Sequence, residues 1–328
     1  MGRLRTPAPI YGETLVPRNP RYVEPNSLVE VTVRCTQGRY LLRPSPELNE
    51  TFIGVLGRAQ EKTGLRLVGT VAMSSHYYLL AVPKDQKQLS RFMCFVNGNL
   101  SKEIGRLHGW PGTLWESRYH SIPVDKDEAT QVARLRYLLS QGVKEDLVER
   151  PEEWPGVHCA RALSEGTELL GKWCDRTKLY RQRVIEKKDV TEEDCTEEVA
   201  LRFSPLPCWQ HYPPEKYQEE VRMLVQKMVD QASQRRSYSE EIVLGAQGVM
   251  EEDPHHLPTQ RKRSTAPLFH ASSSATYKLL YKAFSAVYAA YRLAAEKLRA
   301  GFTDVEYPEG TFPCSLPFVP FECRGDLA

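Results

Sequence analysis

The stretch "VAMSSHYYLLAV", residues 71–82, contains two apolar runs separated by a short polar segment that ends at His76. With the preceding "LRLVGTVAM" (65–73) it predicts two strands joined by a tight hairpin, because short apolar runs bounded by polar residues are typical of buried strands. Alternate residues of a strand share one face, so His76 and Tyr78 are expected on one side and Tyr77 on the other. The hairpin therefore places an imidazole and a phenol together on one sheet surface.

Strands and helices alternate around this hairpin. Residues 28–35, "LVEVTVRC", alternate between apolar and polar side chains and predict a half-buried strand. Helices are expected over 45–64 and 86–107. A fourth strand is expected over 117–124, and a third helix from a cap at Asp125. This order of elements predicts an α+β fold with a ferredoxin-like or RRM-like antiparallel sheet and helices on one face.

The chain divides into four predicted parts. Residues 1–27 are rich in proline and arginine and predict an extended basic arm. The α+β domain is expected over 28–160, followed by a charged linker over 161–200. The remainder, 201–328, is expected to be a mostly helical C-terminal extension.

Composition narrows the class of protein. The 328 residues include 44 lysines and arginines and 42 acidic residues, so the net charge of +2 does not by itself require a polyanionic partner. Eight cysteines without a Cys-x-x-Cys pair argue against a zinc ribbon and favour reduced thiols. No apolar run approaches the roughly 20 residues needed to span a bilayer. We therefore expect a soluble cytoplasmic protein with no membrane partner.

The polar residues of the first strand bear on His76. If this strand pairs beside the hairpin, Glu30, Thr32 and Arg34 lie on the same face as His76 and Tyr78. A carboxylate, a guanidinium, an imidazole and a phenol would then share one surface. An isolated histidine without metal-ligand spacing is more often an ordinary, partly buried side chain. The residues alone leave both interpretations open.

Three motifs carry a resemblance to a known family. They are the Met-x-x-His sequence of the hairpin, the run Leu-Trp-x-x-Arg-Tyr-x-Ser at 114–121, and the segment "ARLRYLLSQGVKEDLVERPEEWPG" at 133–156. With these motifs in order, residues of about 17–160 resemble the single-tyrosine HUH transposases, and among them the REP-associated tyrosine transposases.

The resemblance implies a sheet that binds hairpin or single-stranded DNA. It also implies a site in which two histidines hold Mg or Mn while a helix tyrosine attacks the phosphodiester. His76 matches the first histidine, Tyr78 occupies the second position, and the tyrosine position falls at Leu100. A phenol with a pKa of about 10 is a poor metal ligand. These departures predict a degenerate transposase that binds DNA but has lost or weakened nicking and strand transfer.

Two other functions remain open. The first is an active metal-dependent transposase or nickase with rearranged residues. In it Tyr119 would attack, and Glu30 or Glu103 would complete a metal site with His76. The second is a domesticated subunit that binds RNA or a protein partner within a nucleoprotein complex. For the leading hypothesis we expect association with the bacterial nucleoid.

Basic and aromatic residues of the matching region predict the nucleic-acid surface, because binding requires phosphate neutralisation and a stacking surface. A compact basic cluster in the last third joins them. The predicted residues are Arg34, Arg39, Arg43, Lys102, Arg106, Trp115, Arg118, His120, Arg261, Lys262 and Arg263.

Overall fold

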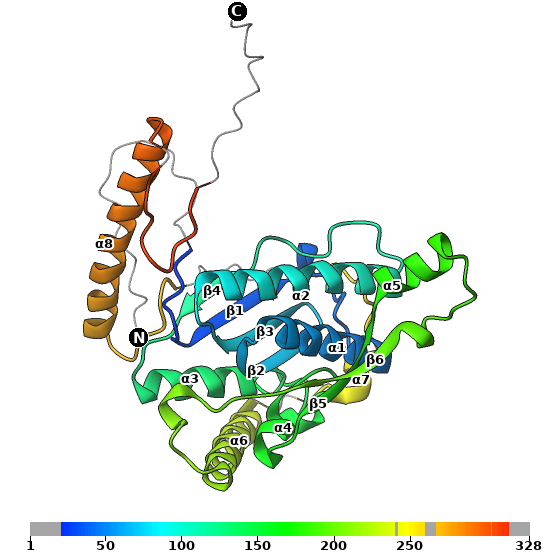
Figure 1. Ribbon diagram of the computed structural model, residues 1–328. Coiled ribbons are helices and arrows are strands. Elements are labelled where there is room, and N and C mark those ends of the chain that lie inside the picture. Colours follow the sequence, from blue (N-terminus) through cyan, green and yellow to red (C-terminus); the bar gives the residue numbers. More distant parts are fainter. Residues whose placement is uncertain (1–20, 240–241, 260–266, 303, 315–328) are drawn as a thin grey trace, which may run out of the picture.

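The computed structural model describes residues 21–239, 242–259, 267–302 and 304–314. The cluster 261–263 and most of the predicted arm lie outside this part of the chain. The helices and strands, shown in Figure 1, are β1 (Val29–Arg34), α1 (Pro46–Thr63), β2 (Arg66–Met73), β3 (His76–Val82), α2 (Gln86–Leu107), β4 (His120–Pro123), α3 (Glu128–Leu139), α4 (Ala160–Glu165), β5 (Leu169–Cys174), α5 (Arg176–Tyr180), β6 (Thr196–Leu201), α6 (Pro214–Ser239), α7 (Gly245–Glu251) and α8 (Ser274–Arg299).

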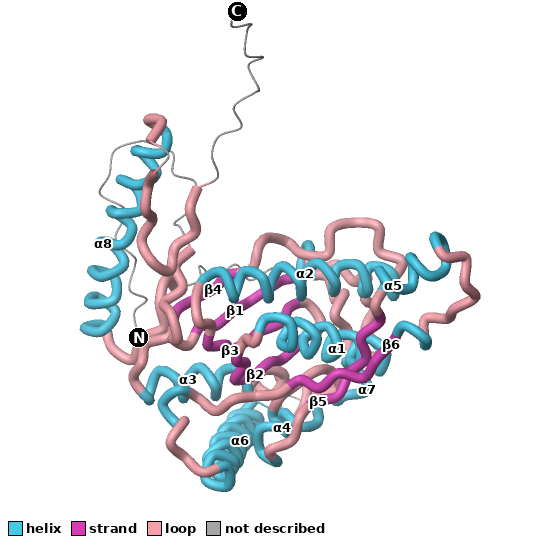
Figure 2. The backbone as a smooth tube through the Cα atoms, in the orientation of Figure 1, coloured by secondary structure: helices cyan, strands magenta, loops and turns pink. Residues whose placement is uncertain are grey.

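The central sheet has four antiparallel strands in the order β2-β3-β1-β4 (Figure 2). Two connections pass through helices, α1 between β1 and β2 and α2 between β3 and β4. This arrangement confirms the predicted α+β class and its ferredoxin-like sheet. The register places His76 opposite Arg34 and Tyr78 opposite Thr32.

The first helix begins and ends where the sequence predicts. The Ser45 hydroxyl accepts a hydrogen bond from the Leu48 amide at 3.2 Å, which caps the amino end of α1. Gly64 ends the helix in the left-handed region, with φ of 65°. In α3 the cap is Asp127 and not Asp125, because the Asp127 carboxylate accepts from the Thr130 amide at 2.8 Å. The third helix therefore begins two residues later than the Asp125 prediction implied.

Helices cover both faces of the sheet. On one face the β1 valines pack against α1 and α2, where Phe52 and Phe92 are fully buried. On the other face Tyr78 and Leu80 of β3 lie in a second core with apolar residues of α3, α4 and α6. The expectation of helices on one face only is thus corrected. The reason is that α3 packs on β2, while the apolar stripe of α6, including Val221 and Val225, packs against α3 and α4 from the last third of the chain.

The expected linker over 161–200 is an ordered part of the domain. Strands β5 and β6 pair in antiparallel register and pack along α1 (Figures 1 and 2). Their apolar residues Trp173, Val199 and Leu201 are buried in the first core. The charged residues that suggested a linker occupy the exposed positions of this ribbon and of the segment projecting beyond α5.

The predicted long helix of the extension is α8, which stands beside the body of the molecule (Figure 1). Short backbone bridges connect its flanking segments to the domain. His270 pairs with Val124 after β4, and Thr311 pairs with Tyr22. No helix among the described residues is both long and apolar enough to cross a membrane.

Candidate nucleic-acid interface

His76 begins β3 directly after the two-residue turn of the hairpin. Its Nδ1 lies 3.1 Å from the Ser75 hydroxyl, and its ring meets the Tyr78 ring edge to face at 5.1 Å. Burial, together with the positive charges of Arg34 and Lys144, lowers the pKa of His76 to about 3. His76 is therefore a neutral imidazole at pH 7 in positively charged surroundings.

Tyr137 of α3 faces this pair. Its hydroxyl oxygen lies 3.3 Å from that of Tyr78, and the two rings pack edge to face at 5.8 Å. Two cations contact its ring, with the Arg134 guanidinium at 4.2 Å and the Lys144 ammonium at 3.9 Å from the centroid. Helix α3 thus supplies a phenol beside Tyr78, on the face of the sheet that also carries His76.

The two phenols differ in acidity. Burial raises the pKa of Tyr78, and so does its hydrogen bond to Tyr137. Burial by itself would also raise the pKa of Tyr137, but hydrogen bonds with Tyr78 and Lys144, and the Lys144 charge, bring it below 10.0. Tyr137 is therefore the more acidic phenol of the pair.

Glu30 holds this helix on the sheet. Its side chain is only 5% exposed, and one carboxylate oxygen accepts from Arg134 Nε at 2.7 Å. The other oxygen lies 3.3 Å from His270 Nε2. Burial tends to raise the pKa of Glu30, but the His270 hydrogen bond and the Arg134 charge outweigh it and lower the pKa below 4.5. Glu30 is thus a structural anion that connects β1, α3 and the segment before α8.

The predicted metal set of His76, Glu30 and Glu103 is not assembled. Glu103 lies on α2, on the other side of the sheet, where Arg106 and Arg176 bind it at 2.6 and 2.8 Å. Both oxygens of Glu30 already have partners. Within the described ranges no group of three His, Cys, Asp or Glu side chains could hold a metal ion. A neutral phenol at Tyr78 and two cations beside His76 do not fit Mg or Mn.

Two other predicted catalytic positions lie away from His76. Leu100 is fully buried on α2 in the first core, so the structure does not bring it to the site. Tyr119 belongs to the same core, with the Arg21 guanidinium 4.0 Å from its ring centroid. Burial raises the pKa of Tyr119, against the opposing effect of Arg21. Neither position shares the face of His76.

Some of the predicted binding residues gather near His76. Arg34 is exposed and lies opposite His76 in the β1–β3 ladder. His120 lies opposite Thr32 in the β1–β4 ladder, which places it on the face of Tyr78, and Arg118 is exposed just before it. Lys144, which the sequence analysis missed, approaches from the turn after α3.

The other predicted binding residues have structural contacts elsewhere. Arg39 and Arg43 donate to the backbone carbonyls of His255 and Met250. Trp115 packs on Tyr77 and donates its indole N–H to Asn97 at 3.0 Å. Lys102 and Arg106 lie on α2, away from the His76 face.

Tyr137 and its neighbours carried a signal in the sequence. Arg134 and Tyr137 are three residues apart on the predicted third helix and so share a side of it. What the sequence lacked was the face of the sheet on which that helix would lie.

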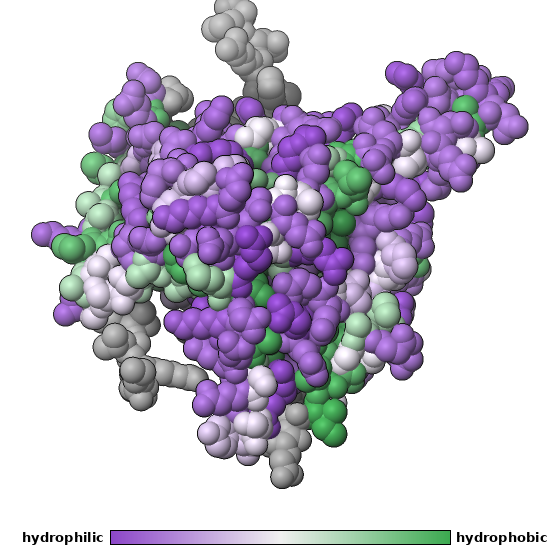
Figure 3. Space-filling view, turned by 90° about the horizontal axis from the view of Figure 1, so that it is seen from below, coloured by the Kyte–Doolittle hydropathy of each residue, from purple (hydrophilic) through white to green (hydrophobic). Residues whose placement is uncertain are grey.

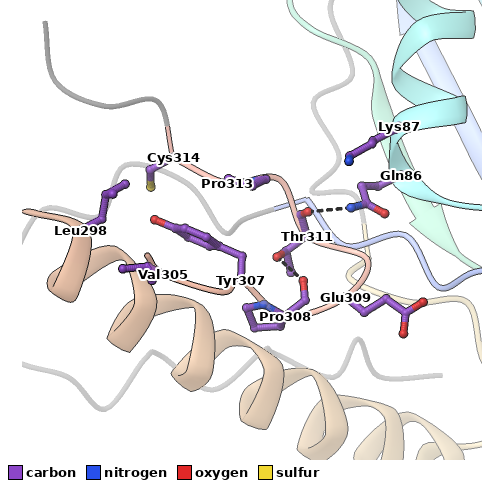
Figure 4. Close-up of a pocket in the computed structure, with 10 residues that line it drawn as sticks. All are labelled: Gln86, Lys87, Leu298, Val305, Tyr307, Pro308, Glu309, Thr311, Pro313 and Cys314. Carbon is purple, nitrogen blue, oxygen red and sulfur yellow. Dashed lines mark hydrogen bonds between the residues drawn. The ribbon is translucent and has the colours of Figure 1, made fainter. Parts of the chain in front are cut away.

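Of two pockets formed by described residues, the second adjoins this site. The first, of about 370 Å³, lies between the first turn of α2 and residues 305–314 (Figure 4). In it Gln86 donates to the Thr311 carbonyl at 3.1 Å, and Tyr307 lies against Cys314 and Leu298. It contains none of the predicted site residues. The second, of about 390 Å³, lies between α3 and α6 and includes Tyr137.

No protein-family model and no curated protein matches the sequence. Two solved structures are similar to part of the chain. A REP-associated tyrosine transposase bound to a REP hairpin shares 15% identity over 44% of this chain and 84% of its own, with a TM-score of 0.36. A candidate transposase from Deinococcus radiodurans R1 shares 18% identity over 35% of this chain and 89% of its own, with a TM-score of 0.27. Both likenesses are distant, and neither carries a conclusion about function.

Proposed function

We propose that this chain is a DNA-binding protein with a transposase-like core, and that it holds the phosphate backbone of hairpin or single-stranded DNA beside Tyr137. The observation that carries the proposal is the pairing of two cations, Arg34 and Lys144, with the uncharged cluster of His76, Tyr78 and Tyr137. Cations neutralise phosphates, and the hydroxyl of Tyr137 can donate a hydrogen bond to a phosphate oxygen beside them. Arg118 and His120 extend the same surface along β4.

Hairpin DNA is expected to bind the full-length chain with a strong dependence on salt. Each cation that contacts a phosphate contributes about 0.7–0.9 to the slope of log affinity against log salt. Arg34→Gln and Lys144→Gln should each lower the slope by about one and weaken binding. Fluorescence anisotropy with a labelled hairpin measures both quantities, and a hairpin in the style of the REP element is the natural first probe.

The matched control is Lys188→Gln, an exposed lysine of the segment beyond α5 that pairs with Glu186 at 2.8 Å. It removes the same charge far from Tyr137 and should leave affinity within about twofold. Salt-independent binding, or no binding, would contradict the proposal. Tighter binding of an RNA hairpin of the same sequence would show that the protein binds RNA in preference to DNA.

The acidity of Tyr137 favours a second candidate function, cleavage of a DNA strand. A phenol is activated as a nucleophile when its pKa falls, and hydrogen bonding to Tyr78 and Lys144 lowers the pKa of Tyr137. In this reaction the Tyr137 oxygen would form a bond to phosphorus. The bond from phosphorus to the 3′ oxygen would break, and that oxygen would leave with a proton as a hydroxyl.

Incubation with hairpin DNA should then give a covalent protein–DNA adduct that Tyr137→Phe abolishes. The assay is denaturing gel electrophoresis with labelled DNA, with and without added Mg or Mn. Tyr119→Phe is the control and should retain the adduct, because Tyr119 lies in the core of the other face. An adduct lost in Tyr119→Phe and kept in Tyr137→Phe would reverse the assignment, and no adduct in any variant would leave binding as the function.

A further inference from the structure

The pocket between α3 and α6 joins the last third of the chain to the proposed binding surface. Its volume is about 390 Å³. One wall is α3 with the turn that follows it, and the other is α6 from the C-terminal extension. The lining residues are Ala133, Arg136, Tyr137, Ser140, Val143, Lys144, Met228, Gln231, Ala232 and Arg235.

The polar groups of the pocket are mostly hydrogen-bond donors. Three of the lining residues, Arg136, Lys144 and Arg235, are cations, and none of the ten is acidic. Two acidic residues outside the pocket lining partly neutralise these cations. Arg235 binds both carboxylate oxygens of Asp146 at 2.5 and 2.6 Å, and Lys144 lies 3.3 Å from Glu145. Arg136 has an uncharged partner across the pocket, the side-chain oxygen of Gln231.

We propose that this pocket binds one phosphate group of a nucleic-acid strand, with Arg136 and Lys144 as its cationic donors and with α6 as part of the site. The inference rests on the proposed DNA-binding function and deepens it. It assigns a role to the C-terminal extension, because helix α6 supplies the second wall of a pocket whose first wall belongs to the α+β core.

The chemistry of the lining favours a phosphate with part of its nucleotide. Guanidinium and ammonium groups neutralise phosphate oxygens, and the hydroxyl of Tyr137 can donate to them. The apolar floor of Ala133, Val143, Met228 and Ala232 suits the uncharged sugar or base edge next to the phosphate. Tyr137 belongs to both the pocket and the His76 cluster, so a strand bound on the proposed surface can reach the pocket without a break.

The wall formed by α6 is fixed in place. Val221, Val225 and Met228 are buried in the second core beneath it. At the far end of the helix, Arg222 donates to the Ser164 carbonyl at 2.7 Å. Hydrophilic residues cover most of the surface seen from this side of the molecule (Figure 3). Gln231 is therefore presented by a packed helix, which limits the entropy lost when a strand binds.

The test places a carboxylate in the pocket without changing side-chain size. Gln231→Glu sets a negative charge opposite Arg136, and should weaken hairpin binding by the full-length protein about tenfold and lower the salt slope by about one. Gln234→Glu makes the same change at an exposed position three residues along the same helix, outside the pocket lining. The hairpin affinity of this control should stay within about twofold of the wild type, because the added charge lies outside the pocket and changes only the overall electrostatic potential of α6.

A second variant, Arg136→Gln, should weaken binding to a similar degree. Hairpins with and without a 5′-phosphate distinguish a terminal phosphate from an internal one. If the wild type binds with a salt slope and Gln231→Glu behaves like Gln234→Glu, the pocket assignment is overturned while DNA binding stands. If the wild type does not bind hairpin DNA at all, both proposals are overturned.

Discussion

Gly54→Ala is expected to destabilise the protein by about 3 kcal/mol, although alanine is the better helix former by about 1 kcal/mol. Gly54 is in the middle of α1, where a Cβ atom would lie 2.0 Å from the Lys172 carbonyl oxygen of β5. The contact is reciprocal, because a Cβ at Gly171 would lie 2.3 Å from the Gly54 amide nitrogen. Backbone atoms cannot move aside as a side-chain end can, so the β5–β6 ribbon would have to leave the helix.

The control for this prediction is Gly98→Ala. Gly98 lies on α2 with no atom within 4 Å of its added Cβ. At this position the higher helix propensity of alanine is not opposed by a steric clash, so the change should stabilise the protein by about 0.5–1 kcal/mol. Urea unfolding followed by circular dichroism measures both. A Gly54→Ala protein as stable as the wild type would show that residues 161–200 do not pack on α1, and the linker interpretation would return.

Glu30→Gln is expected to lower the free energy of unfolding by about 3 kcal/mol. It removes the anion that neutralises Arg134, whose side chain is only 17% exposed, and breaking one partner of a buried pair typically costs about 3–5 kcal/mol. The change also weakens the contact with His270, so the segment before α8 should loosen from β1. Because Arg134 packs on the Tyr137 ring, the same variant should disturb the proposed binding surface.

The control is Glu50→Gln, which breaks a pair with Lys172 in which both side chains are about half exposed. Such surface pairs contribute about 0–1 kcal/mol, so little change is expected. Acid supplies a second check. The pKa of Glu30 is lowered in the folded protein, so its contribution is complete above the ordinary value of 4.5 and is lost as the pH falls through the folded value. The difference between wild type and Glu30→Gln should therefore shrink in acid, and a difference that grows would contradict the ion-pair account.

The sheet and its first two helices could be predicted from the sequence because their signals are local. The alternation of β1, the two-residue turn before His76, the Ser45 cap and the Gly64 stop each act within a few residues of the chain. The shared face of His76, Tyr78 and Arg34 follows from the same strand periodicity and from the pairing of β1 with β3.

The sequence determined by itself which residues form the hairpin and which of them share a face. Only the tertiary structure decided what covers that face. The position of Tyr137 over Tyr78, the burial of Glu30 with Arg134, and the packing of β5 on Gly54 all join residues 59 to 118 positions apart. Such contacts arise when amphipathic elements bury their apolar sides together, and neither turn chemistry nor side-chain periodicity specifies which partner each element meets.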